Sequence, residues 1–164
     1  MIDNNDSLFM NMALSYAKKA AEKGEVPVGA VIVQHGCELV SVGYNLREEG
    51  KNALYHAEIM AIDSACKKLG GWRLPDCTMY VTLEPCPMCA GAVINSRIDR
   101  VVFGAYDNRG GAMGSVFDIN SFGLNHRCEV VGGFMQEDAA QLLRDFFKKK
   151  RECQKLEKTS ETEK

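Results

Sequence analysis

The chain lacks a long run of apolar residues and lacks a strong excess of either charge. No apolar stretch in its 164 residues is long enough to span a bilayer or to serve as a signal peptide. We therefore expect a soluble, cytoplasmic protein with no membrane partner. The formal net charge is −2, without the basic surplus that marks many nucleic-acid-binding domains. A nucleic-acid partner would accordingly need a local basic patch.

The pattern of cysteines excludes a disulfide framework. There are 7 cysteines, an odd number, in a chain that is not short and has no secretory signal. Reduced thiols are expected. Five of these residues show no spacing typical of metal ligands and receive no function; they are Cys37, Cys66, Cys77, Cys128 and Cys153.

The composition that is present is globular, with 46% hydrophobic and 26% charged residues. Periodicity and turn residues predict helices over residues 7–23, 56–69, 87–95 and 137–147, and strands over residues 28–33, 39–44, 79–83, 100–105 and 128–133. This alternation predicts an α/β sheet covered by helices. One domain, residues 1–151, is expected. The polar tail, residues 152–164, is predicted to be frayed or disordered.

Three residues in two separate segments have the chemistry of a zinc site. His56 opens one predicted helix, and Cys86 and Cys89 lie in the Pro-Cys-Pro-Met-Cys segment that opens the next. A structural zinc ion is held by four protein ligands, whereas a catalytic one keeps a position for water. The set of three therefore predicts one catalytic Zn²⁺ per subunit and no organic cofactor.

Glu58 supplies the proton-transfer group that such a site needs. Two thiolates and a neutral imidazole offset the charge of Zn²⁺, so the ion acidifies its water only partly. Glu58 follows His56 by two residues and is placed to act as the base. The N-terminus of a helix favours negative charge, which helps to keep Cys86 and Cys89 as thiolates.

Other readings of the same residues remain open. The Cys86–Cys89 pair also fits a thioredoxin-like redox motif, although such a protein has no need of His56 and Glu58. A zinc-stabilised binding module, the alternative outside enzymes, requires a fourth ligand such as Cys66 or Cys77. The Gly-rich residues 107–115 lack the Gly-Lys-Ser/Thr ending of a phosphate loop, so triphosphate binding is rejected.

His-Ala-Glu and Pro-Cys-Pro-Met-Cys resemble the signature of the zinc nucleoside and nucleobase deaminases. Over residues 8–151 the chain is similar to the tRNA-specific adenosine deaminases, which convert a wobble adenosine to inosine. Matching segments are residues 25–30, 44–45, 72–74, 80–86, 96–98, 102–105, 125–126 and 142–147. One departure precedes His56, where Asn52, Ala53, Leu54 and Tyr55 replace a common Asp-Pro-Thr-like stretch.

The resemblance implies a three-layer α/β/α cytidine deaminase-like fold with a central mixed sheet, and a homodimer. It implies zinc-dependent hydrolytic deamination of the wobble adenosine in the tRNA anticodon arm, with Glu58 moving protons while water attacks C6 of adenine. The substrate-binding residues that it implies are Asn45, Ala57, Val28, Asp107, His126, Phe147 and Arg151.

Some of these roles compete with simpler ones. His126 fits nucleic-acid contact and loop packing equally well, and Glu84 is expected to orient a neighbouring loop and not to catalyse. The cations of residues 148–151 fit either RNA contact or the end of a helix. A deaminase of free guanine, cytosine or cytidine would share the same zinc site, so only the flanking resemblance favours tRNA.

Overall fold

A computed structural model describes the backbone of residues 5–162 and the side chains of residues 5–156. Its elements in chain order are α1 (Asp6–Glu22), β1 (Gly29–Gln34), β2 (Glu38–Tyr44), α2 (Ala57–Leu69), β3 (Cys77–Leu83), α3 (Pro87–Ser96), β4 (Arg100–Ala105), the 3-10 helix η1 (Ile119–Phe122), β5 (Glu129–Val131) and α4 (Gln136–Thr162). Within the described part of the chain, no helix has the length and apolar character needed to cross a bilayer.

The strands form one mixed sheet with the order β2-β1-β3-β4-β5. β1 pairs antiparallel with both β2 and β3, whereas β3–β4 and β4–β5 are parallel pairs. β1 and β2 form a hairpin that turns around His35 and Gly36, with a shift of register between Ile32 and Val33. The parallel pairs need crossover connections, which α3 supplies between β3 and β4.

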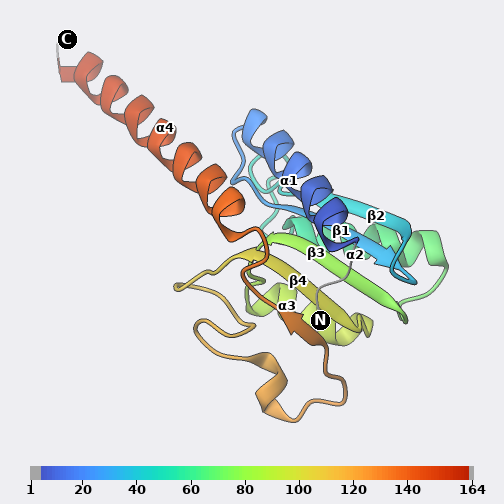
Figure 1. The fold of residues 1–164 in the computed structure, drawn as a ribbon. Helices are drawn as coiled ribbons and strands as arrows, with labels where there is room; N and C mark the ends of the chain where they lie inside the picture. The colour runs from blue at the N-terminus through green and yellow to red at the C-terminus, as the bar shows by residue number, and fades with distance from the viewer. Residues whose placement is uncertain (1–4, 163–164) are drawn as a thin grey trace.

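Helices cover both faces of this sheet, which confirms the three-layer α/β/α class (Figure 1). Side chains of a strand alternate between its two faces. Accordingly, Met79 and Val81 of β3 belong to the core beneath α2 and α3, whereas Tyr80 belongs to the core beneath α1 and α4. The sheet is therefore buried on both sides.

The C-terminal helix is longer than predicted. α4 continues to Thr162, past the end predicted at residue 147 and into residues 152–162, where a frayed tail was expected, and residues 163–164 lie outside the described residues. Residues 136–162 contain no Gly or Pro and many Glu, Lys, Gln and Leu residues, which favour helix without tertiary packing. Figure 1 shows the last turns of α4 projecting away from the sheet.

Candidate active site

The three predicted zinc ligands lie together at two helix N-termini. His56 is the N-cap of α2, Cys86 is the N-cap of α3, and Cys89 lies in the first turn of α3. His56 Nδ1 is 3.7 Å from Cys86 Sγ and 3.5 Å from Cys89 Sγ, and all three ligand atoms lie within 4.8 Å of one another. Tetrahedral zinc with bonds of about 2.0–2.1 Å to nitrogen and about 2.3 Å to sulfur separates such atoms by about 3.5 Å. The spacing therefore fits Zn²⁺.

A close contact between α2 and the sheet positions His56. A Cβ on Gly43 of β2 would lie 2.2 Å from the carbonyl oxygen of Ala57, so only glycine allows this approach. Gly43 lies opposite Ala30 in the neighbouring strand β1. The start of α2 is thereby pressed against the hairpin, and α2 also contacts α3, which carries Cys86 and Cys89.

The pKa values of the Cys86 and Cys89 thiols suit a site that binds a cation. A hydrogen bond from Cys89 lowers the pKa of the Cys86 thiol to about 4, with a further contribution from His56. The neighbouring Cys86 sulfur and burial raise the pKa of Cys89. Two adjacent buried thiolates would repel each other. A divalent ion removes this conflict.

Glu58 is a neighbour of the three ligand residues in the structure, but it is not a member of the ligand cluster. Its carboxyl group is 4% exposed, and burial raises its pKa to about 7. The neighbouring His56 and Cys89 lower this pKa by less than burial raises it, and Glu58 does not share the mutual 4.8 Å spacing of the three ligand atoms. A carboxyl group with a pKa near neutrality both accepts and releases protons at neutral pH.

Three of the predicted base-contacting residues are joined by hydrogen bonds. The backbone N–H of Asn45 donates to the carbonyl of Val28 at 3.2 Å, and the side-chain oxygen of Asn45 accepts from the N–H of Ala57 at 3.1 Å. The side-chain amide of Asn45 also donates to the carbonyl of Val26 at 3.1 Å. Asn45 thus links Val28 to Ala57, the residue that precedes Glu58.

Glu25 is a residue of this region that sequence reasoning missed. Its buried carboxylate accepts hydrogen bonds from the backbone N–H groups of Glu48 and Glu49, at 2.8 and 2.9 Å. It therefore fixes the loop that leads from Asn45 to His56. A buried carboxylate requires such partners, but the sequence alone does not show that Glu25 is buried.

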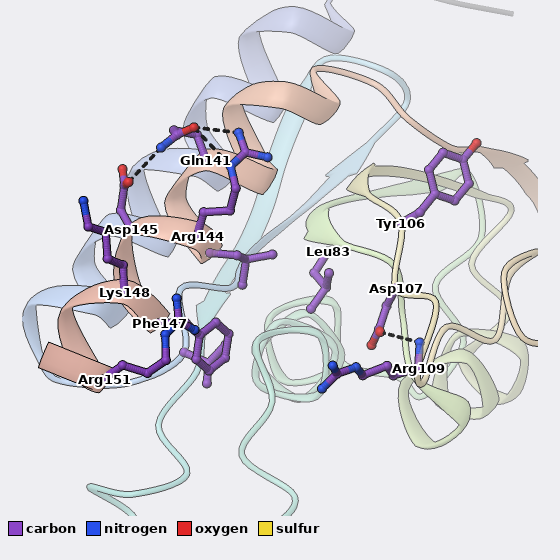
Figure 2. A pocket seen from close by; sticks show the side chains of 12 residues that line it. Leu83, Tyr106, Asp107, Arg109, Gln141, Arg144, Asp145, Phe147, Lys148 and Arg151 are labelled. Carbon is purple, nitrogen blue, oxygen red and sulfur yellow. Dashed lines mark hydrogen bonds between the residues drawn. The ribbon is translucent and has the colours of Figure 1, made fainter. Parts of the chain in front are cut away.

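A cavity of about 900 Å³ opens next to this region, between α4 and the loop that follows β4. It includes Leu83, three residues before Cys86, and Val26, the hydrogen-bond partner of Asn45. Figure 2 shows the side chains of α4 on one side and those of Asp107 and Arg109 on the other. Three predicted substrate-binding residues line it, namely Asp107, Phe147 and Arg151.

The cavity is rich in cations. Arg109, Arg144, Lys148 and Arg151 line it, against the two carboxylates of Asp107 and Asp145. Four of the lining residues were not predicted as site residues, namely Leu83, Tyr106, Arg109 and Arg144. On α4 the spacing of residues 144, 147, 148 and 151 places them on one helix face, and this periodicity was the available signal. Arg109 and Tyr106 could not be predicted in this way, because their position in the cavity depends on the path of the loop after β4.

Two residues with open roles have defined contacts. The Nε2 atom of His126 lies 2.8 Å from the carbonyl oxygen of Ile98, so His126 packs against the turn after α3. Glu84 orients a loop as expected, because its carboxylate accepts hydrogen bonds from the backbone of Asp107, Met113 and Ser115. Neither residue joins the ligand cluster.

The zinc-stabilised binding module lacks its fourth ligand among the residues that the structure describes. The only candidate metal cluster there consists of His56, Cys86 and Cys89, without Cys66 or Cys77. Burial raises the pKa of the Cys66 thiol and of the Cys77 thiol. The redox-pair reading is also weakened, because His56 lies against both sulfurs.

Comparisons with known proteins agree with this geometry. Residues 3–105 match the cytidine and deoxycytidylate deaminase zinc-binding region. The chain is 50% identical over 151 residues to the tRNA-specific adenosine deaminase of Bacillus subtilis (strain 168), covering 92% of this chain and 93% of that one. It is 45% identical to the corresponding protein of Haemophilus influenzae, covering 93% and 89%. A solved structure from studies of A-to-I editing by tRNA:A34 deaminases shares 39% identity and a TM-score of 0.77, covering 84% of this chain and 99% of that one.

Proposed function

The chain belongs to the cytidine and deoxycytidylate deaminase zinc-binding family, and from this premise we propose that it deaminates the wobble adenosine of a tRNA anticodon arm to inosine. The relatives named tRNA-specific adenosine deaminase match over nearly the whole chain, which supports this substrate over a free base. The donor set of His56, Cys86 and Cys89 fits one Zn²⁺ per subunit.

Glu58 is the proposed proton carrier of the reaction. When bound, the zinc ion supplies a Lewis acid that acidifies water at the site. Glu58 takes a proton from the attacking water, passes it to the ring nitrogen next to C6 of adenine, and delivers the next proton to the departing amino group. The water oxygen becomes the C6 oxygen of inosine, and the C6–N bond breaks to release ammonia. A pKa of about 7 suits a group that acts alternately as base and acid.

Val28, Asn45 and Ala57 are proposed to receive the adenine ring. The apolar side chains of Val28 and Ala57 are buried, at 5% and 0% exposure, and suit the flat face of a base. The side chain of Asn45 makes one donated and one accepted hydrogen bond within the protein. An amide has capacity for a second of each kind, so Asn45 can still donate to and accept from the edge of a purine.

The observation that carries the RNA assignment is the cationic cavity that Leu83, three residues before Cys86, also lines. A chain with a formal net charge of −2 gathers Arg109, Arg144, Lys148 and Arg151 around one opening. The ring of Phe147, 41% exposed, lies among them (Figure 2). Cations that meet phosphates and an aromatic ring that stacks on a base are the usual means of binding a single-stranded loop. A free base needs neither.

Further parts of the proposal concern the other site residues. Asp107 lines the cavity wall and is proposed to meet the ribose of a flipped nucleotide, where it can recognise the 2′-OH of RNA. Arg151 lines the same cavity and is proposed to meet a phosphate. His126 contacts the carbonyl of Ile98. We propose that it holds its loop in place and does not contact RNA directly. We also propose a cytoplasmic location, which a tRNA substrate supports.

A homodimer completes the proposal. The segment between β4 and β5 exposes Val116, Phe122 and Leu124 at 54%, 65% and 44%. Exposed apolar side chains that cluster in one segment mark an interaction surface, and a second copy of the chain is the proposed occupant. Light scattering should give twice the mass of the monomer, and Phe122→Asp should shift the mass toward that of the monomer.

The substrate assignment is tested by a side-by-side assay of the purified zinc enzyme. Substrates are an anticodon stem-loop RNA with a wobble adenosine, its DNA equivalent, and free adenosine, guanine and cytosine. Inosine should form fastest in the RNA, because contacts to flanking nucleotides offset the cost of flipping out the base. Turnover of free guanine or cytosine without inosine in the RNA would overturn the tRNA assignment and leave the deaminase chemistry intact.

A further inference from the structure

Glu84 connects the zinc-binding segment to the wall of the cavity. It lies between Leu83 at the end of β3 and the Pro-Cys-Pro-Met-Cys segment, and it is 2% exposed. Its Oε2 atom accepts hydrogen bonds from the backbone N–H of Asp107, at 3.0 Å, and from the hydroxyl of Ser115. Its Oε1 atom accepts from the N–H groups of Met113 and Ser115, both at 3.0 Å.

The loop is fitted closely around this carboxylate. A Cβ on Gly111 would lie 2.3 Å from Glu84 Cδ, so no larger residue fits there without displacing the carboxylate. The N–H of Ala112 donates to the carbonyl of Pro85 at 2.9 Å, and the N–H of Glu84 donates to the carbonyl of Ala105 at 2.9 Å. Residues 105–115 therefore wrap around residues 84–85.

These contacts determine where Asp107 lies. A buried carboxylate is tolerated only when its oxygens are hydrogen-bonded, so the loop must bring its N–H groups to Glu84. Asp107 is the first of these donors and also lines the cavity, opposite α4 (Figure 2). Within the loop, the Asp107 carboxylate accepts from the N–H of Arg109 at 2.9 Å.

We propose that Glu84 is a positioning residue for RNA binding, which fixes the backbone of Asp107 and thereby the cavity wall that faces α4. Glu84 does not touch the substrate or the zinc ion. This inference rests on the proposed function, since it gives Asp107 a role toward the flipped nucleotide. It assigns to Glu84 an effect on substrate affinity and none on the chemical step.

Glu84→Gln tests the proposal with little change of shape. The amide oxygen of Gln can replace Oε1 and accept from Met113 and Ser115, and its NH₂ group can donate to the Ser115 hydroxyl. That NH₂ group then faces the N–H of Asp107, where a donor meets a donor. The variant therefore loses the Asp107 hydrogen bond selectively. KM for the stem-loop RNA should rise on the order of tenfold, the effect of one lost hydrogen bond to a charged group, with kcat and zinc content near those of the wild type.

Ser115→Ala is the matched control. It removes a different hydrogen bond to the same oxygen and leaves the Asp107 bond in place. Its KM should stay within about twofold of the wild type. Equal increases of KM in Glu84→Gln and Ser115→Ala would overturn the proposal, because the loop as a whole, and not Asp107, would then be responsible.

A double-mutant cycle separates positioning from general loosening. Asp107→Ala removes the side chain whose placement is at stake, so adding Glu84→Gln to it should raise KM no further. Additive losses of affinity would contradict the inference. If Glu84→Gln does not fold, Gly111→Ala displaces the same carboxylate and should give the same rise of KM with normal zinc content. If Gly111→Ala folds without that rise, the inference fails.

Failure of the inference can be told from failure of the proposed function. If the wild-type enzyme forms no inosine in the stem-loop RNA, the proposed function is wrong and the cycle has no baseline. If the wild type forms inosine and Glu84→Gln lowers kcat without raising KM, the proposed function stands and the positioning role of Glu84 is refuted.

Discussion

The side-chain oxygen of Asn45 accepts a hydrogen bond from the backbone N–H of Ala57 at 3.1 Å. Ala57 is the first residue of α2 and stands between the zinc ligand His56 and Glu58. The first N–H groups of a helix have no partner within the helix, so Asn45 satisfies one that would otherwise be buried and unpaired. One side chain thereby ties the segment that follows β2 to the start of α2, where the proposed zinc ligand and proton carrier lie.

Replacing Asn45 should affect stability and chemistry together. Asn45→Ala leaves a buried N–H on Ala57 and a carbonyl on Val26 without their partner, which costs about 1–3 kcal/mol, and it should lower kcat because the start of α2 loses a constraint. Asn45→Asp keeps the acceptor for Ala57 but adds a negative charge near Glu58. It should retain more stability than Asn45→Ala and still be slow. Urea unfolding and single-turnover rates measure both effects, and a stable Asn45→Ala would contradict the structural role.

Glu58→Gln should separate catalysis from metal binding. The carboxyl group is the proposed proton carrier and lies outside the ligand cluster, so the variant should keep its zinc and lose about 10²–10⁴-fold in single-turnover rate. Elemental analysis and rapid-quench assays on the stem-loop RNA measure the two properties. A variant that loses its zinc would make Glu58 a ligand, and one with near-normal rates would remove it from the mechanism.

The pKa of Glu58 also predicts how stability depends on pH in the metal-free protein. Burial raises this pKa from 4.5 to about 7, so the folded state binds the proton more tightly than the unfolded state does. The difference in unfolding free energy between wild type and Glu58→Gln should therefore fall as pH rises from about 4.5 to about 7, by up to about 1.4 kcal/mol per pH unit. Urea unfolding in the presence of a chelator tests this, and a rise over that range would contradict the assignment.

Removing any one zinc ligand should destabilise the protein. His56 begins α2 and Cys86 begins α3, so the ion ties two helix starts together. His56→Ala, Cys86→Ala and Cys89→Ala should each lower zinc occupancy and melting temperature, and a chelator should destabilise the wild type more than the variants. The matched control is Cys128→Ala, a buried cysteine outside the cluster, which should keep its zinc. Wild-type zinc content in Cys86→Ala would mean that another group serves as ligand.

The sequence predicted the zinc site well because the chemistry constrains residue types at fixed spacing. A zinc ion needs particular ligands, and His56 and Cys86 cap the starts of two helices that the sequence marks, with Cys89 in the first turn of the second. The strands were predicted to within a few residues because buried β-branched runs are distinctive. The last strand was too long in the prediction, since β5 covers only Glu129–Val131.

Contacts that depend on the path of a loop could not be predicted. The hydrogen bonds from the N–H of Glu48 to Glu25 and from the N–H of Asp107 to Glu84 join residues more than 20 positions apart. Nothing local in the sequence marks a glutamate as buried. The end of α4 was mispredicted because a charged segment without a hydrophobic face resembles a disordered tail, although its residues favour helix. The cations of residues 148–151 were treated as one group in the sequence, but in the structure only two of them line the cavity.

Lys148 and Arg151 line the cavity, whereas the ammonium group of Lys150 lies 6.0 Å from the centre of the Phe146 ring. Residues three apart share a helix face, so Lys148 and Arg151 act as a pair. Replacing both with Ala should weaken binding of the stem-loop RNA and lower the slope of log K against log salt by about 1.4–1.8, the value for two lost phosphate contacts. Fluorescence anisotropy over a range of NaCl concentrations measures the slope.

The matched control for this pair is Lys149→Ala with Lys150→Ala, which removes the same charge from positions that do not line the cavity. Long-range attraction depends on net charge and would weaken equally in both double variants. Direct phosphate contacts depend on position, so the control should change the slope by well under one. Equal slopes for the two double variants would show that α4 attracts RNA only through its overall charge. The cavity would then not be the RNA-binding surface.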